Sequence, residues 1–300
     1  MRVLVTGADG FVGTHLCRHL RAQGDEVLAY GGPASQAPEV RAIDIRREAE
    51  VLQMVSDARP EGIIHLAGWA SVGSSYAQPT PCFEVNALGT AYVVDAIRKQ
   101  APHARFLLIS SGEVYGEVPG GGASSEPTPL SPKSPYATSK LAAELVTRQF
   151  IASYSLDAVI ARAFNHVGPG QDERFVIPSL ARQLIAIRDG KAGREILVGN
   201  LDPIRDFSSV LDVVEAYRIL LVRGVSGETY NVCSGRAQSI REVVSQLIES
   251  AGVDAELVVD QQRVRPSDIA RLVGDPRKIA GLGWSAHRPP LQGIWGEFTS

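Results

Sequence analysis

Three glycines, each separated by two residues, follow the first apolar segment of the chain. Residues 3–6 have the composition of a buried strand, and residues 13–23 have helical spacing, with Leu16 and Leu20 on one face. Glycines at such a junction let the backbone approach a pyrophosphate, and the helix directs its free N–H groups at the phosphates. An ordinary βα turn is the alternative, but this context favours a phosphate-binding loop made by Gly7, Gly10, Phe11, Val12 and Gly13.

Short apolar segments alternate with helical ones along most of the chain. We expect further strands at 27–30, 62–67, 105–110 and 158–162, and helices at 84–99 and 135–153. This alternation favours an α/β fold of the Rossmann type, a doubly wound parallel sheet with a smaller C-terminal substrate-binding lobe. We assign residues 1–167 plus 205–226 to the dinucleotide-binding lobe, and residues 168–204 plus 227–300 to the smaller lobe, which we expect to bind a sugar nucleotide.

A tyrosine and a lysine lie four residues apart in the helix predicted at 135–153. Tyr136 and Lys140 therefore share one face, and Ser134 with Pro135 is a typical start for that helix. A nearby ammonium favours phenolate, so we expect a lowered pKa for Tyr136 and proton transfer to or from a carbonyl or alcohol oxygen. The pair alone also fits an ordinary amphipathic helix. The upstream glycine loop makes a catalytic pair the better interpretation.

The glycine spacing, the Y-x-x-x-K pair and the segment from Ser110 to Gly116 together resemble the extended short-chain dehydrogenase/reductase superfamily. The resemblance implies that Ser111, four residues before Tyr115, is the catalytic hydroxyl, and that Tyr136 and Lys140 also contact the cofactor. It further implies that Asp44 and Ile45 contact the adenine ring. Leu66, Ala67 and Gly68 match the segment that runs beneath the adenine ribose and phosphates.

The end of the second strand decides between NAD and NADP in such folds. An acidic residue there binds the ribose 2′-hydroxyl of NAD, whereas an arginine accommodates the 2′-phosphate of NADP. This chain has Tyr30-Gly31-Gly32, which offers neither group. The sequence therefore predicts a nicotinamide cofactor and leaves NADP and NAD both open.

Glu113 stands where the sugar-nucleotide 4,6-dehydratases carry the base that removes a proton beside the ketone. Nucleoside-diphosphoglucose dehydratases place an aspartate before it, and this chain has Gly112. Three roles stay open for Glu113: a base, a residue that binds a substrate hydroxyl, or a structural residue.

Motifs in the second half resemble the GDP-6-deoxy-4-keto-mannose reductases. Arg162–Gln171 looks like the substrate-loop motif of those reductases. Two other segments are similar to ones that the reductases share with GDP-mannose 4,6-dehydratases: Val198–Asp202 with Arg205-Asp206-Phe207, and Arg265-Pro266-Ser267-Asp268. The resemblance implies that Arg205 and Arg265 bind the diphosphate of a GDP-sugar and that Asp268 accepts from a ribose hydroxyl. It further implies that Asn165 holds the diphosphate or sugar side and that Ser71 lies near the hexose. Arginine suits a diphosphate because its fork donates two hydrogen bonds.

These motifs imply NAD(P)H-dependent reduction of the C4 ketone of GDP-4-keto-6-deoxymannose, with GDP-rhamnose as product. A 4,6-dehydratase of the same superfamily is the alternative, favoured by Glu113 but not by Gly112 or the short chain. A 4-epimerase is less favoured, because epimerases usually retain NAD with an acid where Gly31 stands. A non-catalytic dinucleotide sensor would not need Ser111, Tyr136 and Lys140.

Composition excludes several other classes. A formal net charge of -3 without a basic tract gives no case for nucleic acid, and no apolar stretch is long enough to span a membrane. Three widely spaced cysteines predict a cytoplasmic protein without disulfides or a metal site.

The superfamily resemblance implies a homodimer formed through the helices around 84–99 and 136–153.

Overall fold

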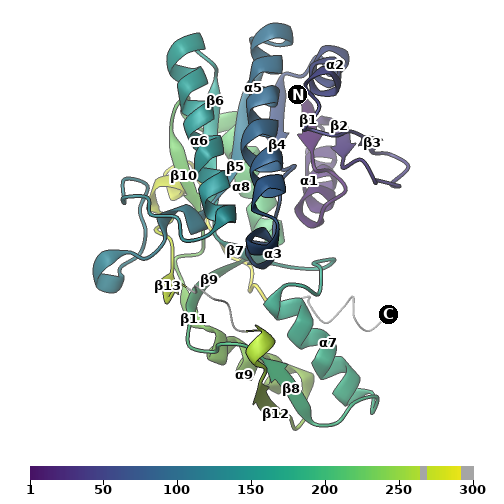
Figure 1. Ribbon diagram of the computed structural model, residues 1–300, viewed down its shortest axis with the longest axis vertical. Coiled ribbons are helices and arrows are strands. Elements are labelled where there is room, and N and C mark those ends of the chain that lie inside the picture. The colour runs from purple at the N-terminus through teal and green to yellow at the C-terminus, as the bar shows by residue number, and fades with distance from the viewer. Residues whose placement is uncertain (264–268, 292–300) are drawn as a thin grey trace.

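A seven-stranded parallel sheet forms the centre of the computed structural model, which describes residues 1–263 and 269–291 (Figure 1). Its order is β10-β6-β5-β4-β1-β2-β3. The strands are β1 (Arg2–Thr6), β2 (Glu26–Gly31), β3 (Arg41–Ala42), β4 (Gly62–His65), β5 (Arg105–Ser111), β6 (Ala158–Ala163) and β10 (Thr229–Val232). The chain runs outward in one direction from β1 and in the other from β4, so the carboxyl ends of these two strands flank a switch point. The expected Rossmann-type fold class is confirmed.

Helices cover both faces of this sheet, because its strands are apolar on both sides. One face packs against α1 (Phe11–Ala22) and α8 (Val210–Arg223). The other packs against α2 (Glu48–Ala58), α5 (Gly89–Gln100) and α6 (Pro135–Tyr154). Leu4 and Val5 show the division, since neighbouring residues of β1 belong to the two different cores and both are fully buried. Burial of each such side chain contributes roughly 1.5–3 kcal/mol.

A smaller second lobe lies beyond the carboxyl ends of the large sheet (Figure 1). It contains a sheet of β7 (Asn165–Val167), β9 (Ile204–Ser209), β11 (Ala237–Ser239) and β13 (Arg271–Leu272), and the pair β8 (Glu195–Val198) with β12 (Glu256–Val259). Its core lies between these strands, α7 (Val176–Arg188) and α9 (Ile240–Ala251). Short helices complete the fold: α3 (Val72–Ala77), α4 (Pro79–Phe83), α10 (Arg277–Ala280) and a π-helical turn, Glu84–Leu88.

The lobe boundaries expected from the sequence differ from the strand pairing at two places. β10 was assigned to the substrate lobe with residues 227–300, but it pairs in parallel with β6 and extends the large sheet. β9 was assigned to the dinucleotide lobe with residues 205–226, but it pairs with β7, β11 and β13. Both differences have one cause. Strands that pair can be distant in sequence, so the order of elements along the chain does not determine which sheet a strand joins.

A buried ion pair ties helix α6 to the large sheet. Glu144 accepts hydrogen bonds from Arg162 Nε at 3.0 Å and Nη2 at 2.8 Å, and from Ser110 Oγ at 2.6 Å. The side chains of Arg162 and Glu144 are only 3% and 0% exposed. Burial makes each charge dependent on the other, because a lone charge in this environment has no water to solvate it.

We predict that Glu144→Gln lowers the free energy of unfolding by about 3–5 kcal/mol, because it leaves the buried Arg162 without its counter-charge. Urea unfolding measures this change. The matched control is Asp95→Asn, which breaks ion pairs with Arg98 and Lys99 on the surface of α5 and should cost less than about 1 kcal/mol. Equal losses in the two variants would contradict the prediction.

Candidate active site

One large cavity, with a volume of about 1280 Å³, lies between the carboxyl ends of the large sheet and the second lobe. Its lining includes the glycine loop, the ends of β4 and β5, the start of α6, and parts of β7, β8 and β9. A pocket for one small ligand measures roughly 300–1,000 Å³. This cavity exceeds that range, so its volume is compatible with more than one bound ligand.

The glycine loop meets the end of β4 at close range. Gly7 has a φ of +70°, and a Cβ there would lie 2.7 Å from Ala67 N and 2.9 Å from the carbonyl carbon of Leu66. Thr6 Oγ1 fixes this junction, because it accepts from Ala67 N at 3.2 Å and bonds His65 Nδ1 at 2.7 Å. Gly7 therefore has no room for a side chain, and the loop packs backbone to backbone on the end of β4, as a pyrophosphate-binding turn requires.

All of the residues expected to bind the cofactor line this one cavity. Among the lining residues, Asp44 is followed by Ile45 and Arg46 along the chain. The Arg46 guanidinium bonds both oxygens of Asp44, at 2.9 and 2.7 Å, and this hydrogen bonding holds the pKa of Asp44 below its usual value. The structure brings together, on the same wall, Gly7, Gly10, Phe11, Val12, Gly13, Leu66, Ala67 and Gly68.

The expected catalytic residues come from β5 and from the first turns of α6. Ser134 Oγ accepts from Ala137 N at 3.1 Å and Pro135 occupies the first turn, as the sequence predicted for this helix start. Lys140 Nζ donates to the carbonyl of Ile109 at 3.0 Å. Ser111, Glu113, Tyr136 and Lys140 all line the cavity. Their catalytic roles stay predictions.

Burial dominates the electrostatics of this group. It raises the pKa of Tyr136 to about 12, against the opposing effect of a hydrogen bond with Ser111, and Glu113 adds to the rise. It lowers the pKa of Lys140 to about 8. The lowered pKa expected for Tyr136 is therefore wrong for this structure. Desolvation of the phenol outweighs any effect of the ammonium, which instead donates to a backbone carbonyl.

Asn86 is a buried residue behind the cavity wall that supports the site and that the sequence did not reveal. It lies in the π-helical turn before α5, where its Nδ2 donates to Ser139 Oγ at 2.8 Å and its Oδ1 accepts from Trp69 N at 2.7 Å. A Cβ at Gly68 would lie 2.8 Å from Asn86 Oδ1 and 3.2 Å from Lys140 Nζ. Asn86 therefore packs the cofactor wall against α6. No motif marked it, because an isolated asparagine in a helical segment gives no signal.

The expected substrate residues lie on the other half of the cavity wall. Ser71 caps α3 by accepting from Ser74 N, Asn165 begins β7, and the 6% exposed Arg205 donates to the carbonyl of Ile269 at 2.7 Å. All three line the cavity. Two other expected residues, Arg265 and Asp268, lie outside the described residues.

Two further arginines line this half and were not identified from the sequence. Arg174 is bound by Asp172, and Arg263 Nη1 donates to Ser179 Oγ at 3.1 Å. Neither belongs to a recognisable motif, so only the folded chain shows that they face the same space as Arg205.

Comparison with known proteins agrees with this geometry. A sequence profile of the family "GDP-mannose 4,6 dehydratase" matches residues 4–292. The GDP-6-deoxy-D-mannose reductase of Pseudomonas aeruginosa is 37% identical over 100% of this chain and 97% of its own length. The chain belongs to the GDP-mannose 4,6-dehydratase family. The expected resemblance to the extended short-chain dehydrogenase/reductase superfamily is thereby confirmed.

Solved structures extend this comparison to the cofactor. RMD from Pseudomonas aeruginosa, complexed with NADPH, has a TM-score of 0.88 and 33% identity, with 99% of each chain covered. The UDP-glucose 4-epimerase of Thermus thermophilus, in complex with NAD, has a TM-score of 0.87 and 32% identity, with 100% of this chain and 99% of the other covered. Relatives in this fold thus carry either dinucleotide, which agrees with the open choice from the sequence.

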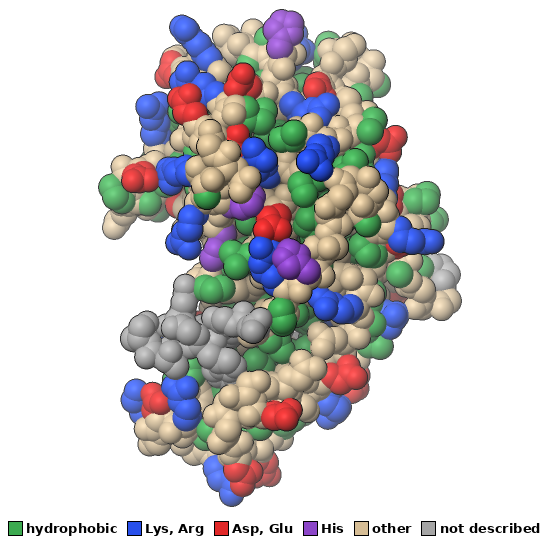
Figure 2. All heavy atoms as spheres, turned by 180° about the vertical axis from the view of Figure 1, so that it is seen from behind, with side chains coloured by type: hydrophobic (Ala, Val, Ile, Leu, Met, Phe, Trp, Pro, Cys, Tyr) green, Lys and Arg blue, Asp and Glu red, His purple; other side chains and the backbone are tan. Residues whose placement is uncertain are grey.

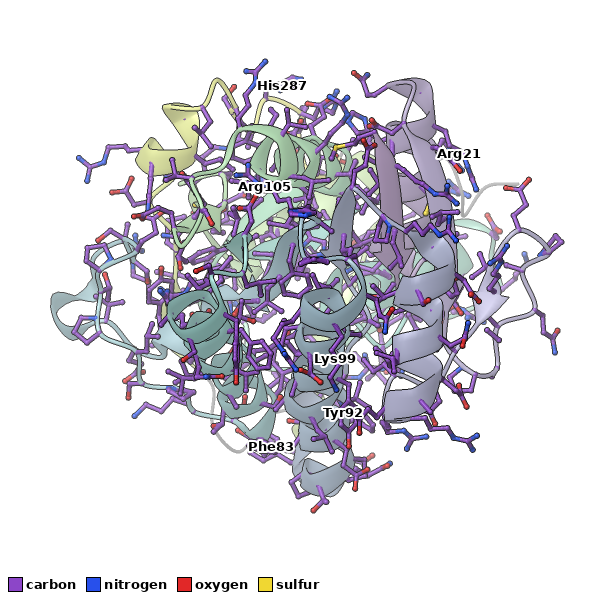
Figure 3. All side chains as sticks on the ribbon, turned by 90° about the horizontal axis from the view of Figure 1, so that it is seen from above. Arg21, Phe83, Tyr92, Lys99, Arg105 and His287 are labelled. Atoms are coloured by element: carbon purple, nitrogen blue, oxygen red, sulfur yellow. The ribbon has the colours of Figure 1, made fainter. Side chains whose placement is uncertain are left out.

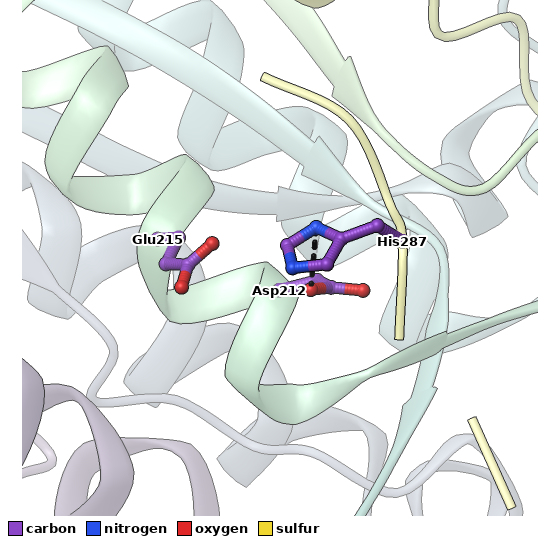
Figure 4. Close-up of side chains that lie close together, drawn as sticks. All are labelled: Asp212, Glu215 and His287. Atoms are coloured by element: carbon purple, nitrogen blue, oxygen red, sulfur yellow. Dashed lines mark ion pairs between the residues drawn. The ribbon is translucent and has the colours of Figure 1, made fainter. Parts of the chain in front are cut away.

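A carboxylate cluster outside the cavity has a structural explanation. Ligand atoms of Asp212, Glu215 and His287 lie within 4.8 Å of one another (Figure 4). Arg288 bonds both carboxylates, reaching Glu215 at 2.6 Å. The Arg288 guanidinium lies between the two carboxylates, so the cluster fastens the segment around 284–288 to α8 in this member of the family. No helix among the described residues has the length and apolar character to cross a membrane.

We predict that Lys140→Met stabilises the protein more at pH 7 than at pH 9.5. With a folded pKa of about 8, Lys140 binds fewer protons in the folded state than in the unfolded state over this range. Wild-type stability therefore rises with pH between about 8 and the unfolded value of about 10.4, by up to about 3 kcal/mol in total. The variant lacks this pH-dependent contribution to the free energy of unfolding. Urea unfolding of both proteins at several pH values measures the difference.

The exposed Lys191, 75% accessible at its side chain, provides the matched control, Lys191→Met. The change in the free energy of unfolding caused by Lys191→Met should be the same across this pH range. A Lys140→Met effect that is equal at pH 7 and pH 9.5 would contradict the prediction.

Proposed function

We propose that this protein reduces the C4 ketone of GDP-4-keto-6-deoxymannose to GDP-rhamnose, with a nicotinamide cofactor. The observation that carries the proposal is one cavity that joins a dinucleotide cradle at Gly7, the group of Ser111 with Tyr136, and the cation of Arg205. The Pseudomonas aeruginosa relative, named a GDP-6-deoxy-D-mannose reductase, supports the assignment over the full length of the chain.

The residues of the proposed reaction have complementary proton chemistry. NADH or NADPH, when bound along the glycine loop, supplies the hydride. The raised pKa of Tyr136 keeps its phenol protonated at neutral pH, so it is ready to give a proton to the C4 oxygen. The Ser111 hydroxyl, which hydrogen-bonds Tyr136, polarises the same oxygen. Lys140 holds the nicotinamide ribose and orients the start of α6 against Ile109.

The second half of the cavity suits a diphosphate. We assign the diphosphate to Arg205 and Arg265, with Asn165 on the sugar side, Asp268 at a ribose hydroxyl and Ser71 near the hexose. Arg174 and Arg263 also line the cavity, and each is paired with an aspartate, Asp172 or Asp260.

A 4,6-dehydratase is the alternative function, because Glu113 lines the cavity and acts electrostatically on Tyr136. Such an enzyme would regenerate its cofactor in each turnover, whereas a reductase consumes it. A measurement of net cofactor consumption during turnover therefore separates the two functions.

We place the enzyme in the cytoplasm without a nucleic-acid partner. Cys17, Cys82 and Cys233 are all free and buried, as expected in a reducing compartment. On the face in Figure 2, blue and red side chains are interspersed, which agrees with the net charge of -3 and offers no basic stripe for a phosphate backbone.

We also propose a homodimer formed through α5 and α6. Leu88, in the π-helical turn before α5, is 44% exposed, and Leu145 on α6 is 59% exposed. Phe83 and Tyr92 lie in the same helical layer outside the sheet (Figure 3). Exposed apolar side chains on adjacent helices favour a helical interface with a second copy of the chain.

For the proposed reaction, we predict that Tyr136→Phe lowers kcat by about 10²–10⁴-fold, because it removes the proton donor. The protein is mixed with GDP-4-keto-6-deoxymannose and either NADH or NADPH, and loss of the reduced-nicotinamide absorbance is followed. Cofactor affinity should stay within about threefold of wild type, since Phe preserves the ring and its packing. Tyr154→Phe, at the other end of α6, is the matched control.

Stoichiometric loss of the reduced cofactor with the wild type supports the reductase. No loss with either cofactor, together with conversion of GDP-mannose alone to a GDP-4-keto-6-deoxy sugar with loss of water, would establish the dehydratase instead. A fully active Tyr136→Phe enzyme would refute the catalytic role of Tyr136.

For the dimer, we predict that Leu88→Glu combined with Leu145→Glu gives a monomer, because the interface would bury uncompensated charges. Light scattering after size-exclusion chromatography measures the mass. Val225→Glu changes a similarly exposed residue, 57% accessible, after α8 and should leave the mass unchanged. A wild-type monomer would overturn the proposal.

A further inference from the structure

The end of β2 carries no side chain for the adenosine ribose of a dinucleotide. Gly31 ends the strand and Gly32 follows it, and both line the cavity. Folds of this type place here the acid that binds a ribose 2′-hydroxyl or the arginine that binds a 2′-phosphate. The recognition group in this chain must therefore come from another segment.

Asp9, from the glycine loop, occupies this position. Its two carboxylate oxygens accept from the N–H of Gly32 at 3.3 and 3.2 Å. A Cβ at Gly31 would lie 2.5 Å from Asp9 Cγ and 2.6 and 2.7 Å from the two oxygens. The carboxylate thus fills the space where a side chain of residue 31 would begin. This explains why residue 31 is glycine, although its backbone is ordinary strand.

The charges around Asp9 do not neutralise it. Asp9 is exposed and lines the same cavity as Gly31, Gly32 and Pro33. Among the described residues lining this end of the cavity, Arg46 supplies the positive charge, and its guanidinium is held by both oxygens of Asp44. Arg47 also pairs with Asp44 and with Glu50, so both arginines are held by other carboxylates. Asp9 makes no ion pair with any described residue, and its free carboxylate opposes a phosphate and suits a hydroxyl donor.

We propose that Asp9 is the residue that selects the cofactor, and that it makes this enzyme prefer NADH over NADPH. Its carboxylate accepts from the 2′-hydroxyl of the adenosine ribose and repels a 2′-phosphate at the same place. This inference rests on the proposed function only in requiring that a nicotinamide dinucleotide binds. It assigns to this chain a preference that the NADPH complex of the Pseudomonas aeruginosa relative does not suggest.

Direct binding tests the proposal without any sugar nucleotide. NADH and NADPH are titrated separately into the full-length protein, and nicotinamide fluorescence gives each Kd. We expect wild type to bind NADH at least about tenfold more tightly than NADPH. Asp9→Asn keeps the shape and an acceptor oxygen for Gly32 N–H but removes the charge. It should tighten NADPH by about tenfold and change NADH by less than about threefold.

A second probe isolates the hydrogen bond from the repulsion. NADH lacking the adenosine 2′-hydroxyl should bind wild type several-fold more weakly than NADH, and should bind Asp9→Ala as well as NADH does. The charge-matched control is Asp57→Asn on α2, whose carboxylate accepts from Gln53 on the surface and lies away from the cavity. It should leave the ratio of the two Kd values unchanged.

Two results would overturn the inference while leaving the proposed function intact. In the first, wild type binds NADPH as tightly as NADH. In the second, Asp9→Asn has the same ratio of the NADPH Kd to the NADH Kd as wild type. Failure of both dinucleotides to bind a folded protein would instead defeat the proposed function and, with it, the inference. A thermal unfolding curve for each variant establishes that it is folded.

Discussion

The buried ion pair between Glu144 and Arg162 is the contact on which the geometry of the site depends. It joins α6 to β6, and the Ser110 hydroxyl that bonds Glu144 adds β5. The Arg162 guanidinium also lies 4.8 Å from the centre of the Tyr115 ring. Because Glu144 stands two turns after Tyr136 on one helix face, the pair fixes the helix that carries the phenol against the strand that carries Ser111.

Desolvation then sets the chemistry of the residues that this packing brings together. Tyr136 is partly buried and Lys140 is buried, and this desolvation moves both toward their neutral forms, with pKa values of about 12 and about 8. A neutral phenol can give a proton, whereas a phenolate would have to take one. The same packing that stabilises the fold thus prepares the site for reduction of a ketone. It does so at a cost in stability, since no carboxylate of the described residues forms an ion pair with the buried Lys140, whose Nζ donates to the carbonyl of Ile109.

Local signals in the sequence predicted most of the fold and the catalytic face of the cavity. The glycine spacing located the Gly7 loop, and the cap at Ser134 located the start of α6, because both depend on residues close together in the chain. The pairing of β10 with β6 was missed because it depends on distant segments. Asn86 and Asp9 were missed for the same reason. Their partners, Ser139 and Gly32, are far away in sequence, so no spacing marks them.

Asp206 shows how the second lobe presents its cations to this cavity. Its carboxylate is fully buried and accepts from Ser234 N and Oγ, from Gly235 N and from Gly274 N. These donors lie after β10 and β13, so one side chain of β9 fastens the small sheet to the edge of the large one. Successive residues of a strand point to opposite faces. Anchoring Asp206 on one face therefore directs its neighbour Arg205 to the other, where it lines the cavity. The position of the cation that we assign to the diphosphate thus follows from the contact that holds the two sheets together.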